Sequence, residues 1–263
     1  MEDDEKLDLK IHEMAQRLCR ARSSGNSIPS ADIIVPSDVS SAMQIQSLVQ
    51  QASGVAVSGW KVAIGPEKRA IAAPLVDILT SPAELRLCPN FLIEVEVAVV
   101  LQKDLPRREA PYDRSDVLAA IDYAFLGIEI IGGRFEEPKS VPFLSFLADH
   151  LGNRAFVTGD ILPLSTLNRL ADLTCHVSFD GASIYSEKAS HPAQDPLAPL
   201  LAYANEPNDY VGGLKAGDIV TTGSVCGVLP INQTGVVKAD LGTLGQVALE
   251  FTGSEELYGF LVR

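Results

Sequence analysis

The sequence lacks any apolar run close to the ~20 residues that a membrane-spanning helix needs. Its N-terminal stretch, MEDDEKLDLK, is charged where a signal peptide would carry an apolar segment. Cysteine is scarce, and the thiols form neither a CxxC motif nor a Cys/His pairing, which argues against a zinc cluster and a disulfide scaffold. The four cysteines are Cys19, Cys88, Cys175 and Cys226. We therefore expect a soluble, cytoplasmic protein whose thiols are free and mostly buried.

Basic residues are also few. The chain has 21 Lys and Arg against 34 Asp and Glu, and its formal net charge is −13. Nucleic acids and anionic membranes both require basic patches, so neither is an expected partner. A small molecule is the expected substrate. If that substrate is itself an acid, a bound cation must reverse the local field.

With 263 residues, of which 46% are hydrophobic, the chain can bury a substantial core in one main domain with a small appendage. Residues 5–22 carry apolar side chains at helical spacing. Pro36-Ser37-Asp38 precedes a second periodic run and indicates a capped helix. We predict that residues 1–55 form a helical N-terminal appendage.

Beyond Gly59 the sequence changes to short runs typical of strands, separated by Gly, Pro and Asp. Asp180-Gly181 is the two-residue loop of a tight hairpin, and helices are predicted over residues 115–124 and 195–204. Residues 56–263 are thus predicted to form a predominantly β domain, which gives an α+β fold class.

Two acids stand out in the apolar run LIEVEVAVVL. Because side chains alternate along a strand, Glu94 and Glu96 share one face while their apolar neighbours point the other way. A solvated face is the more common explanation of such an isolated pair. A third acid, Glu129, lies in the run FLGIEI, and a strand that returns after a short helix commonly lies near its predecessor. Three converging carboxylates with room for water and substrate oxygens suit Mg²⁺ or Mn²⁺.

Two further ionisable residues are candidates for chemistry. Lys61 lies in the run GWKVAIG, where it either extends its ammonium to water or, if desolvated, binds an anion or transfers a proton. Asp77 lies in APLVDIL, where it serves either a turn or, beside a metal, as a general base. None of the four histidines shows ligand spacing or a nearby nucleophile motif, so none receives a role.

Several segments, read in order, resemble the fumarylacetoacetate hydrolase superfamily over residues 55–252. The similarity is greatest to its 2-keto-4-pentenoate hydratase and 4-oxalocrotonate decarboxylase branch. The ordered set is more specific than any one of its parts. The segments are GWKVAIGP, EVEVAVVL, GIEIIGGRF, ADHLGNRAFVTG, GLKAGDIVTTGS and VKADLGTLGQVALEF.

This resemblance implies a mixed, barrel-like β-roll of the fumarylacetoacetate hydrolase C-terminal type and an assembly of identical subunits. It also implies roles for individual side chains. The metal ligands for Mg²⁺ or Mn²⁺ would be Glu94, Glu96 and Glu129, the catalytic residues Lys61 and Asp77, and the substrate-binding residues Thr222, Ser224 and Asn153.

The chain departs from the branch at two places. Relatives usually read E-I-x-D-S-R where this chain has Glu129-Ile-Ile-Gly-Gly-Arg134, and A-D-N-A-S-S-G where it has ADHLGNR at residues 148–154. Gly132 and Asn153 thus replace groups that line the family's pocket. The substrate, or even the reaction, is therefore open.

The reaction implied by the resemblance is hydration of a 2-hydroxy-2,4-dienoate to a 4-hydroxy-2-oxo acid, through an enolate whose charge a bound cation stabilises. The same device serves decarboxylation of the 4-oxalocrotonate type and C–C hydrolysis of the acylpyruvate type. A catalytically idle protein that only binds a 2-oxo acid is a further alternative, against which the retention of Lys61 and the three glutamates weighs.

Overall fold

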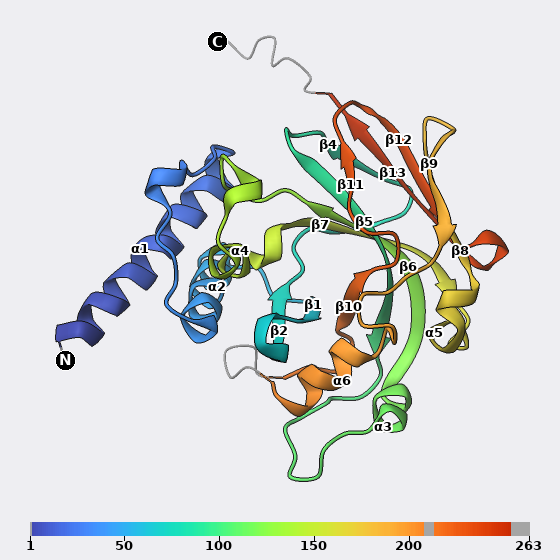
Figure 1. The fold of residues 1–263 in the computed structure, drawn as a ribbon, viewed down its shortest axis with the longest axis horizontal. Coiled ribbons are helices and arrows are strands. Elements are labelled where there is room, and N and C mark those ends of the chain that lie inside the picture. Colours follow the sequence, from blue (N-terminus) through green and yellow to red (C-terminus); the bar gives the residue numbers. More distant parts are fainter. Residues whose placement is uncertain (1, 208–212, 254–263) are drawn as a thin grey trace, which may run out of the picture.

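The computed structural model of the chain describes residues 2–207 and 213–253. Two sheets make up most of this part, with helices mainly toward the N-terminus (Figure 1). This arrangement confirms the predicted mixed, mainly β architecture. Among the described helices, none combines the length and apolarity needed to cross a bilayer.

The larger sheet curls around the centre of the molecule (Figure 1). Its strands, in spatial order, are β2 (Ala70–Pro74), β1 (Gly59–Ile64), β10 (Ile219–Ser224), β5 (Phe91–Leu101), β6 (Ile121–Ile131), β7 (Asn153–Leu162) and β3 (Ile78–Thr80), with β11 (Leu229–Ile231) also paired to β5. Most neighbours are antiparallel, but β1 runs parallel to β10, and β3 to β7.

The smaller sheet lies against one end of the larger one. Its strands, in spatial order, are β4 (Ala83–Arg86), β13 (Gln246–Thr252), β12 (Gly235–Asp240), β8 (Thr174–Phe179) and β9 (Ala182–Lys188). The predicted hairpin turn at Asp180-Gly181 joins β8 to β9, and both residues have positive φ, 47° and 80°. A tight two-residue turn of type I′ requires this conformation at both positions, which Asp tolerates and Gly favours.

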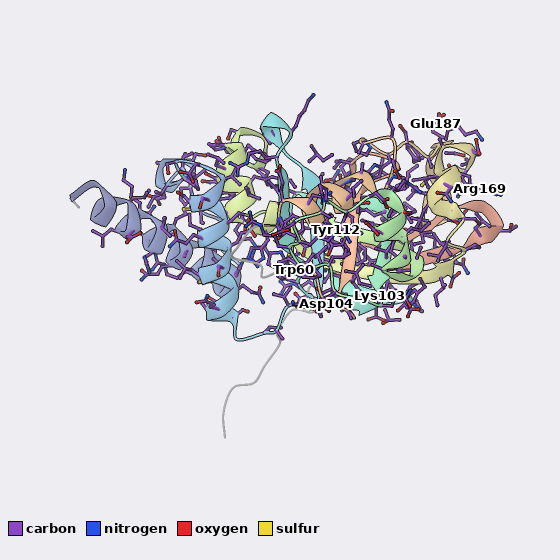
Figure 2. The ribbon with its side chains drawn as sticks, turned by 90° about the horizontal axis from the view of Figure 1, so that it is seen from below. Trp60, Lys103, Asp104, Tyr112, Arg169 and Glu187 are labelled. Carbon is purple, nitrogen blue, oxygen red and sulfur yellow. The ribbon has the colours of Figure 1, made fainter. Side chains whose placement is uncertain are left out.

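The helices are α1 (Glu2–Ser24), α2 (Val39–Ser53), α3 (Arg114–Ala119), α4 (Phe143–Ala148), α5 (Thr166–Arg169) and α6 (Ala198–Asn205). Short 3₁₀ turns cover Ser30–Asp32, Pro66–Lys68, Pro138–Ser140, His150–Gly152, Leu170–Asp172 and Gly242–Leu244. Figure 2 shows α1 at one end of the molecule and Arg169 and Glu187 near the other.

The two N-terminal helices follow the predicted pattern. Asp38 caps α2 by accepting a 2.7 Å hydrogen bond from the backbone N–H of Ser41, and Gly54 ends the helix in the left-handed conformation. The apolar faces of α1 and α2 share a buried cluster with residues of β2 and α4. The predicted boundary between an appendage and a β domain near residue 55 stays a prediction.

The predicted helices further along the chain are shorter than expected. The helix expected over residues 115–124 ends at Ala119, because β6 begins at Ile121 and pairs there with Leu101 of β5. Its start carries a capping box formed by Asp113 and Asp116. The helix expected from residue 195 begins at Ala198.

The two sheets touch closely at Gly159 of β7. A Cβ at this position would lie 2.6 Å from the carbonyl oxygen of Gln246 and 2.6 Å from Cβ of Val247 in β13. Backbone atoms cannot move aside as a flexible side chain can. We therefore expect Gly159→Ala to lower the free energy of unfolding by about 2 kcal/mol, as overpacking typically does.

Urea denaturation followed by circular dichroism would measure this loss. Gly253→Ala is the matched control, because among the described residues its added Cβ would meet only Thr234 Cγ2, at 3.9 Å. Equal stability of the two variants would contradict the close sheet contact.

Candidate metal centre

Neighbouring strands of the larger sheet bring the three predicted glutamates together. Glu94 of β5 is directly opposite Glu129 of β6, and Glu96 lies two positions further along the same face of β5. On the other side of β5, strand β10 places Ser224 opposite Glu96. Strand β1 pairs with β10 and adds Lys61. The sheet order alone thus gathers side chains that are far apart in the sequence.

The three carboxylates form a compact group. Each offers an oxygen atom, and the three oxygens lie within 4.8 Å of one another. Glu96 and Glu129 are completely buried, whereas the side chain of Glu94 is 13% exposed. The pair on β5 is therefore not a solvated face. Glu94 provides the side that solvent and ligands can reach.

The ammonium of Lys61 lies among these carboxylates. Its Nζ is 2.6 Å from Oε2 of Glu129 and 3.3 Å from Oε2 of Glu94. Burial by itself would lower the pKa of Lys61, but the negative charges of Glu129, Glu94 and Glu96 outweigh it and raise the pKa above its ordinary value. Lys61 is accordingly a protonated, buried cation.

For Glu96, the structure shows no direct contact of this kind among the described residues. Neither of its carboxylate oxygens has a hydrogen-bond partner among the described residues, and both are buried. Burial, followed by the charge of Glu129, raises the pKa of Glu96 well above its ordinary value, and burial likewise raises that of Glu129. A buried carboxylate without a partner is costly, so the site favours an additional cation.

The charges of the site indicate the charge of that cation. With every group ionised, as metal binding requires, the three carboxylates carry −3 and the ammonium of Lys61 carries +1, which leaves −2. A divalent ion cancels this charge, and an all-oxygen donor set suits hard ions such as magnesium, manganese or calcium. The residues present therefore fit a divalent metal centre.

Asn153 at the start of β7 supports Glu129. Its Nδ2 donates a 2.9 Å hydrogen bond to Oε1 of Glu129, while its Oδ1 accepts one of 2.8 Å from the backbone N–H of Val76. Sequence reasoning anticipated Asn153 only as a substrate contact. In the structure its side chain bonds protein groups at both ends and orients a metal-ligand candidate, so the substrate contact stays a prediction.

We expect Asn153→Ala to weaken divalent-metal binding about 10- to 100-fold, the usual effect of removing a group that orients a metal ligand. Calorimetric titration of Mn²⁺ into metal-stripped protein would measure the change. Asn168→Ala, at an exposed position of α5, is the control. Wild-type affinity in a folded Asn153→Ala variant would show that this hydrogen bond does not orient Glu129 for metal binding.

A cavity of about 370 Å³ opens beside the carboxylates. Lys61, Glu94, Thr222 and Ser224 all line it, so the structure brings these predicted residues together. The hydroxyl of Ser224 donates to the carbonyl oxygen of Gly227 at 2.7 Å. The cavity thus offers an ammonium, a carboxylate and hydroxyl groups to a small polar molecule.

His191 also lines this cavity, although its sequence context gave no sign of a role. Its Nε2 donates to the carbonyl oxygen of Thr222 at 3.1 Å, and its Nδ1 accepts from the backbone N–H of Ala193 at 3.2 Å. Burial lowers the pKa of His191. This bonding pattern therefore belongs to a neutral imidazole that holds the segment carrying Thr222 in place.

Asp77, predicted to act with Lys61, is not among the residues that line the cavity. Its side chain is 64% exposed, and its nearest cationic contact is Arg154 Nη1 at 4.0 Å. Its φ is 46°, an uncommon value that Asp tolerates in turns. A catalytic role for Asp77 stays a prediction.

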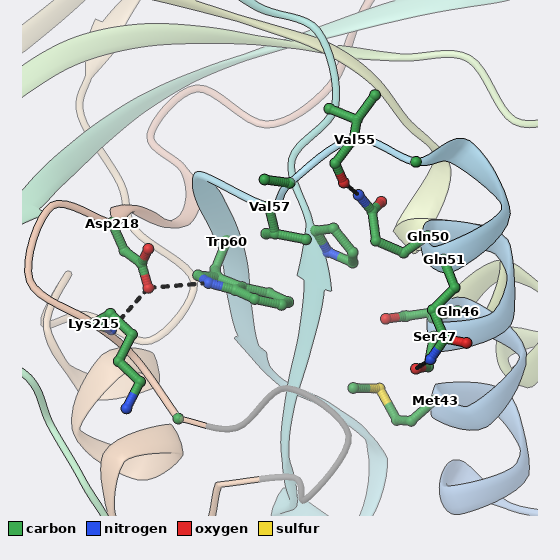
Figure 3. Close-up of a pocket in the computed structure, with 14 residues that line it drawn as sticks. Met43, Gln46, Ser47, Gln50, Gln51, Val55, Val57, Trp60, Lys215 and Asp218 are labelled. Carbon is green, nitrogen blue, oxygen red and sulfur yellow. Dashed lines mark hydrogen bonds between the residues drawn. The ribbon is translucent and has the colours of Figure 1, made fainter.

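The side chain next to Lys61 faces a different space. Trp60 lines a cavity of about 610 Å³ beside α2, where its indole N–H donates to Asp218 at 3.2 Å (Figure 3). Successive side chains of β1 point to opposite faces. This cavity includes none of the three glutamates, so the candidate metal centre belongs to the other face of the strand.

Together, the curled mixed sheet and its buried carboxylate cluster define a mixed α/β protein with a site suited to a divalent cation. The chain belongs to the fumarylacetoacetate (FAA) hydrolase C-terminal family, whose model matches residues 15–252.

Several curated relatives are similar over almost the whole chain. A 2-keto-4-pentenoate hydratase of Burkholderia vietnamiensis is 26% identical over 264 residues, covering 93% of this chain and 98% of the relative. A 2-keto-4-pentenoate hydratase of Pseudomonas putida is 25% identical, with 92% and 95% covered.

Solved structures show the same fold. A 4-oxalocrotonate decarboxylase from Pseudomonas putida G7, complexed with magnesium and adipate, superimposes with a TM-score of 0.78 at 19% identity, covering 93% of this chain and 98% of that one. The same protein complexed with calcium and acetate superimposes with a TM-score of 0.76 at 20% identity. The resemblance seen in the sequence, the fold class and the expectation of an enzyme are thereby confirmed, whereas the reaction stays open.

Proposed function

We propose that the chain is a hydratase that adds water to a 2-hydroxy-2,4-dienoate and releases a 4-hydroxy-2-oxo acid. We propose further that Glu94, Glu96 and Glu129 hold Mg²⁺ or Mn²⁺ for this reaction. The observation that carries the proposal is the cluster of three carboxylates beside a cavity that Lys61 also lines. The similarity to curated hydratases supports the choice of substrate class.

A bound divalent ion would act as a Lewis acid that stabilises negative charge on the 2-oxygen of the substrate. The protein supplies the remaining groups. The ammonium of Lys61 offers a positive charge and a proton at the cavity wall, and the hydroxyl of Thr222 offers a hydrogen bond to a substrate oxygen. The hydroxyl of Ser224 donates its proton to Gly227, so it offers the substrate only an acceptor. Glu94 is the cluster member that lines the cavity, so the substrate enters from its side.

The proton balance of the reaction assigns work to Lys61. Ketonisation removes the proton of the 2-hydroxyl and adds one at C5, and hydration then adds the water oxygen at C4 and a proton at C3. These transfers need a group that can give and regain a proton beside the substrate. Lys61 lines the cavity beside Glu94, whereas Asp77 does not line it. The proposal therefore gives the proton transfer to Lys61.

The test is to incubate the protein with 2-hydroxypenta-2,4-dienoate and Mg²⁺ or Mn²⁺ and to follow loss of the dienol absorbance. Mass spectrometry should show a product that has gained one water. Release of carbon dioxide from a 2-oxo-3-enedioate, without hydration of the dienoate, would replace this proposal with a decarboxylase. Absence of turnover with either compound would leave a protein that only binds 2-oxo acids.

The resemblance to the family also leads us to propose a homo-oligomer. Light scattering coupled to size-exclusion chromatography would test it, and a mass equal to one chain at working concentrations would contradict it.

A further inference from the structure

A separate pocket of about 200 Å³ lies between the end of α1, the loop after β6 and the start of β7. Three arginines line it: Arg22 from the last turn of α1, Arg134 from the loop, and Arg154 from β7. We call it the arginine pocket. Of the described residues that line it, none is acidic. In a protein whose net charge is −13, such a local excess of positive charge needs an explanation.

Nearby acids compensate these arginines only in part. Asp149 is completely buried and accepts hydrogen bonds from Arg22 Nη2 at 3.1 Å and from the backbone N–H of Arg134 at 2.8 Å. Exposed Asp77 is 4.0 Å from Arg154 Nη1, too far for a hydrogen bond. Burial lowers the pKa of Arg134 to about 10; Asp149 opposes this shift, whereas Arg22 and Arg154 add to it. The three cations thus repel one another in a poorly solvated place.

Two donor groups of the arginine pocket lack a hydrogen-bond partner among the described residues. Arg134 Nη2 and Arg22 Nε are buried and have no hydrogen-bond partner among the described residues. Arg134 as a whole is only 6% exposed, and its other terminal nitrogen, Nη1, donates to the carbonyl oxygen of Asn153 at 2.8 Å. A buried donor without a partner costs free energy that an acceptor would recover. An anion in the pocket would supply both the charge and the acceptors.

We propose that the arginine pocket binds a small oxyanion, either a phosphate group or a carboxylate of a short diacid. A planar guanidinium can donate two parallel hydrogen bonds to two oxygens of either group, whereas an ammonium cannot. The volume of about 200 Å³ is below that of ordinary drug-sized ligand pockets, which favours a small anion over a nucleotide. None of the residues that line the cavity of the candidate metal centre lines this pocket.

Arg154 is the best residue to change. Arg22 and Arg134 both bond Asp149, and Arg134 also holds the backbone of Asn153, so their loss would disturb the fold and the support of Glu129. The side chain of Arg154 is 37% exposed, and the one ion pair that it makes with a described residue is long. Arg154→Gln keeps most of its volume and removes its charge.

The test is calorimetric titration of the full-length protein with inorganic phosphate, and separately with succinate, at low ionic strength. Each titration is made with and without Mg²⁺, because an anion held by a metal would bind only in its presence. We expect saturable binding of at least one anion under both conditions, weakened about tenfold in Arg154→Gln. Arg169→Gln, an exposed arginine distant from α1 in Figure 2, should bind like the wild type.

The anion that binds with the higher affinity identifies the chemical class of the natural ligand, phosphate or carboxylate. Arg154→Lys keeps the charge without the fork and should recover only part of the affinity, which gives a second variant if Arg154→Gln does not fold. Lack of saturable binding of both anions would overturn the proposal. Binding unchanged in a folded Arg154 variant, or seen only with Mg²⁺ present, would overturn it equally.

Discussion

Glu96→Gln is expected to abolish turnover and to weaken divalent-metal binding by about 100-fold or more, beyond the effect of losing an orienting group. Glu96 is completely buried, and neither of its oxygens has a partner in the described part of the chain. The amide keeps the shape of the side chain but removes the charge and replaces one oxygen donor with nitrogen. With Lys61 still present, the cluster would then carry only −1, and a divalent ion would leave it with a net charge of +1.

Without metal, the same substitution should raise the stability of the protein. Glutamine removes the cost of ionising a buried carboxyl group that has no hydrogen-bond partner among the described residues, so metal-free Glu96→Gln should unfold at a higher temperature than the metal-free wild type. Glu187→Gln is the matched control, because Glu187 is exposed on β9, near the end of the molecule opposite α1 (Figure 2). A Glu96→Gln variant with wild-type Mn²⁺ affinity would remove Glu96 from the ligand set.

Lys61→Met is expected to lower turnover by about 10²- to 10⁴-fold while metal binding persists, because a positioned proton-transfer group contributes on that scale. Methionine fills much of the space of the lysine stem but carries neither charge nor proton. The cluster then holds −3 without the ammonium that now lies 2.6 Å from Glu129. The metal-free variant should be less stable than the metal-free wild type. Added Mg²⁺ should raise the melting temperature of the variant by more than it raises that of the wild type.

Steady-state kinetics together with thermal unfolding at several Mg²⁺ concentrations would measure both effects. Lys103→Met, at an exposed position labelled in Figure 2, controls for loss of a lysine as such. If Lys61→Met retains wild-type turnover, the proton steps belong to another group, and exposed Asp77 would be examined next.

Two simple regularities of the sequence indicated the carboxylate cluster, although they did not suffice to predict it. Side chains alternate along a strand, which puts Glu94 and Glu96 on one face, and consecutive strands commonly lie side by side, which brings Glu129 to them. The observed register places Glu94 opposite Glu129. No sequence pattern specifies that register, so the resemblance to the family had to supply the confidence that periodicity lacked.

Other parts of the site depend on contacts that no local pattern records. The hydrogen bond from Asn153 to Glu129 links residues 24 positions apart, next to a register shift between β6 and β7. The contact between His191 and Thr222 spans 31 positions. Helix ends were uncertain for a different reason: the apolar residues around Ala119 fit both α3 and the start of β6, and pairing with β5 decides between them.

The proposed reaction requires that the three glutamates bind a divalent ion. The most direct measurement is an anomalous difference map from crystals grown with Mn²⁺ and recorded near the manganese absorption edge. We predict one strong peak per chain among the carboxylates of Glu94, Glu96 and Glu129, absent in crystals of Glu96→Gln. An empty cluster in wild-type crystals at saturating Mn²⁺, with the ammonium of Lys61 still bonded to Glu129, would contradict it.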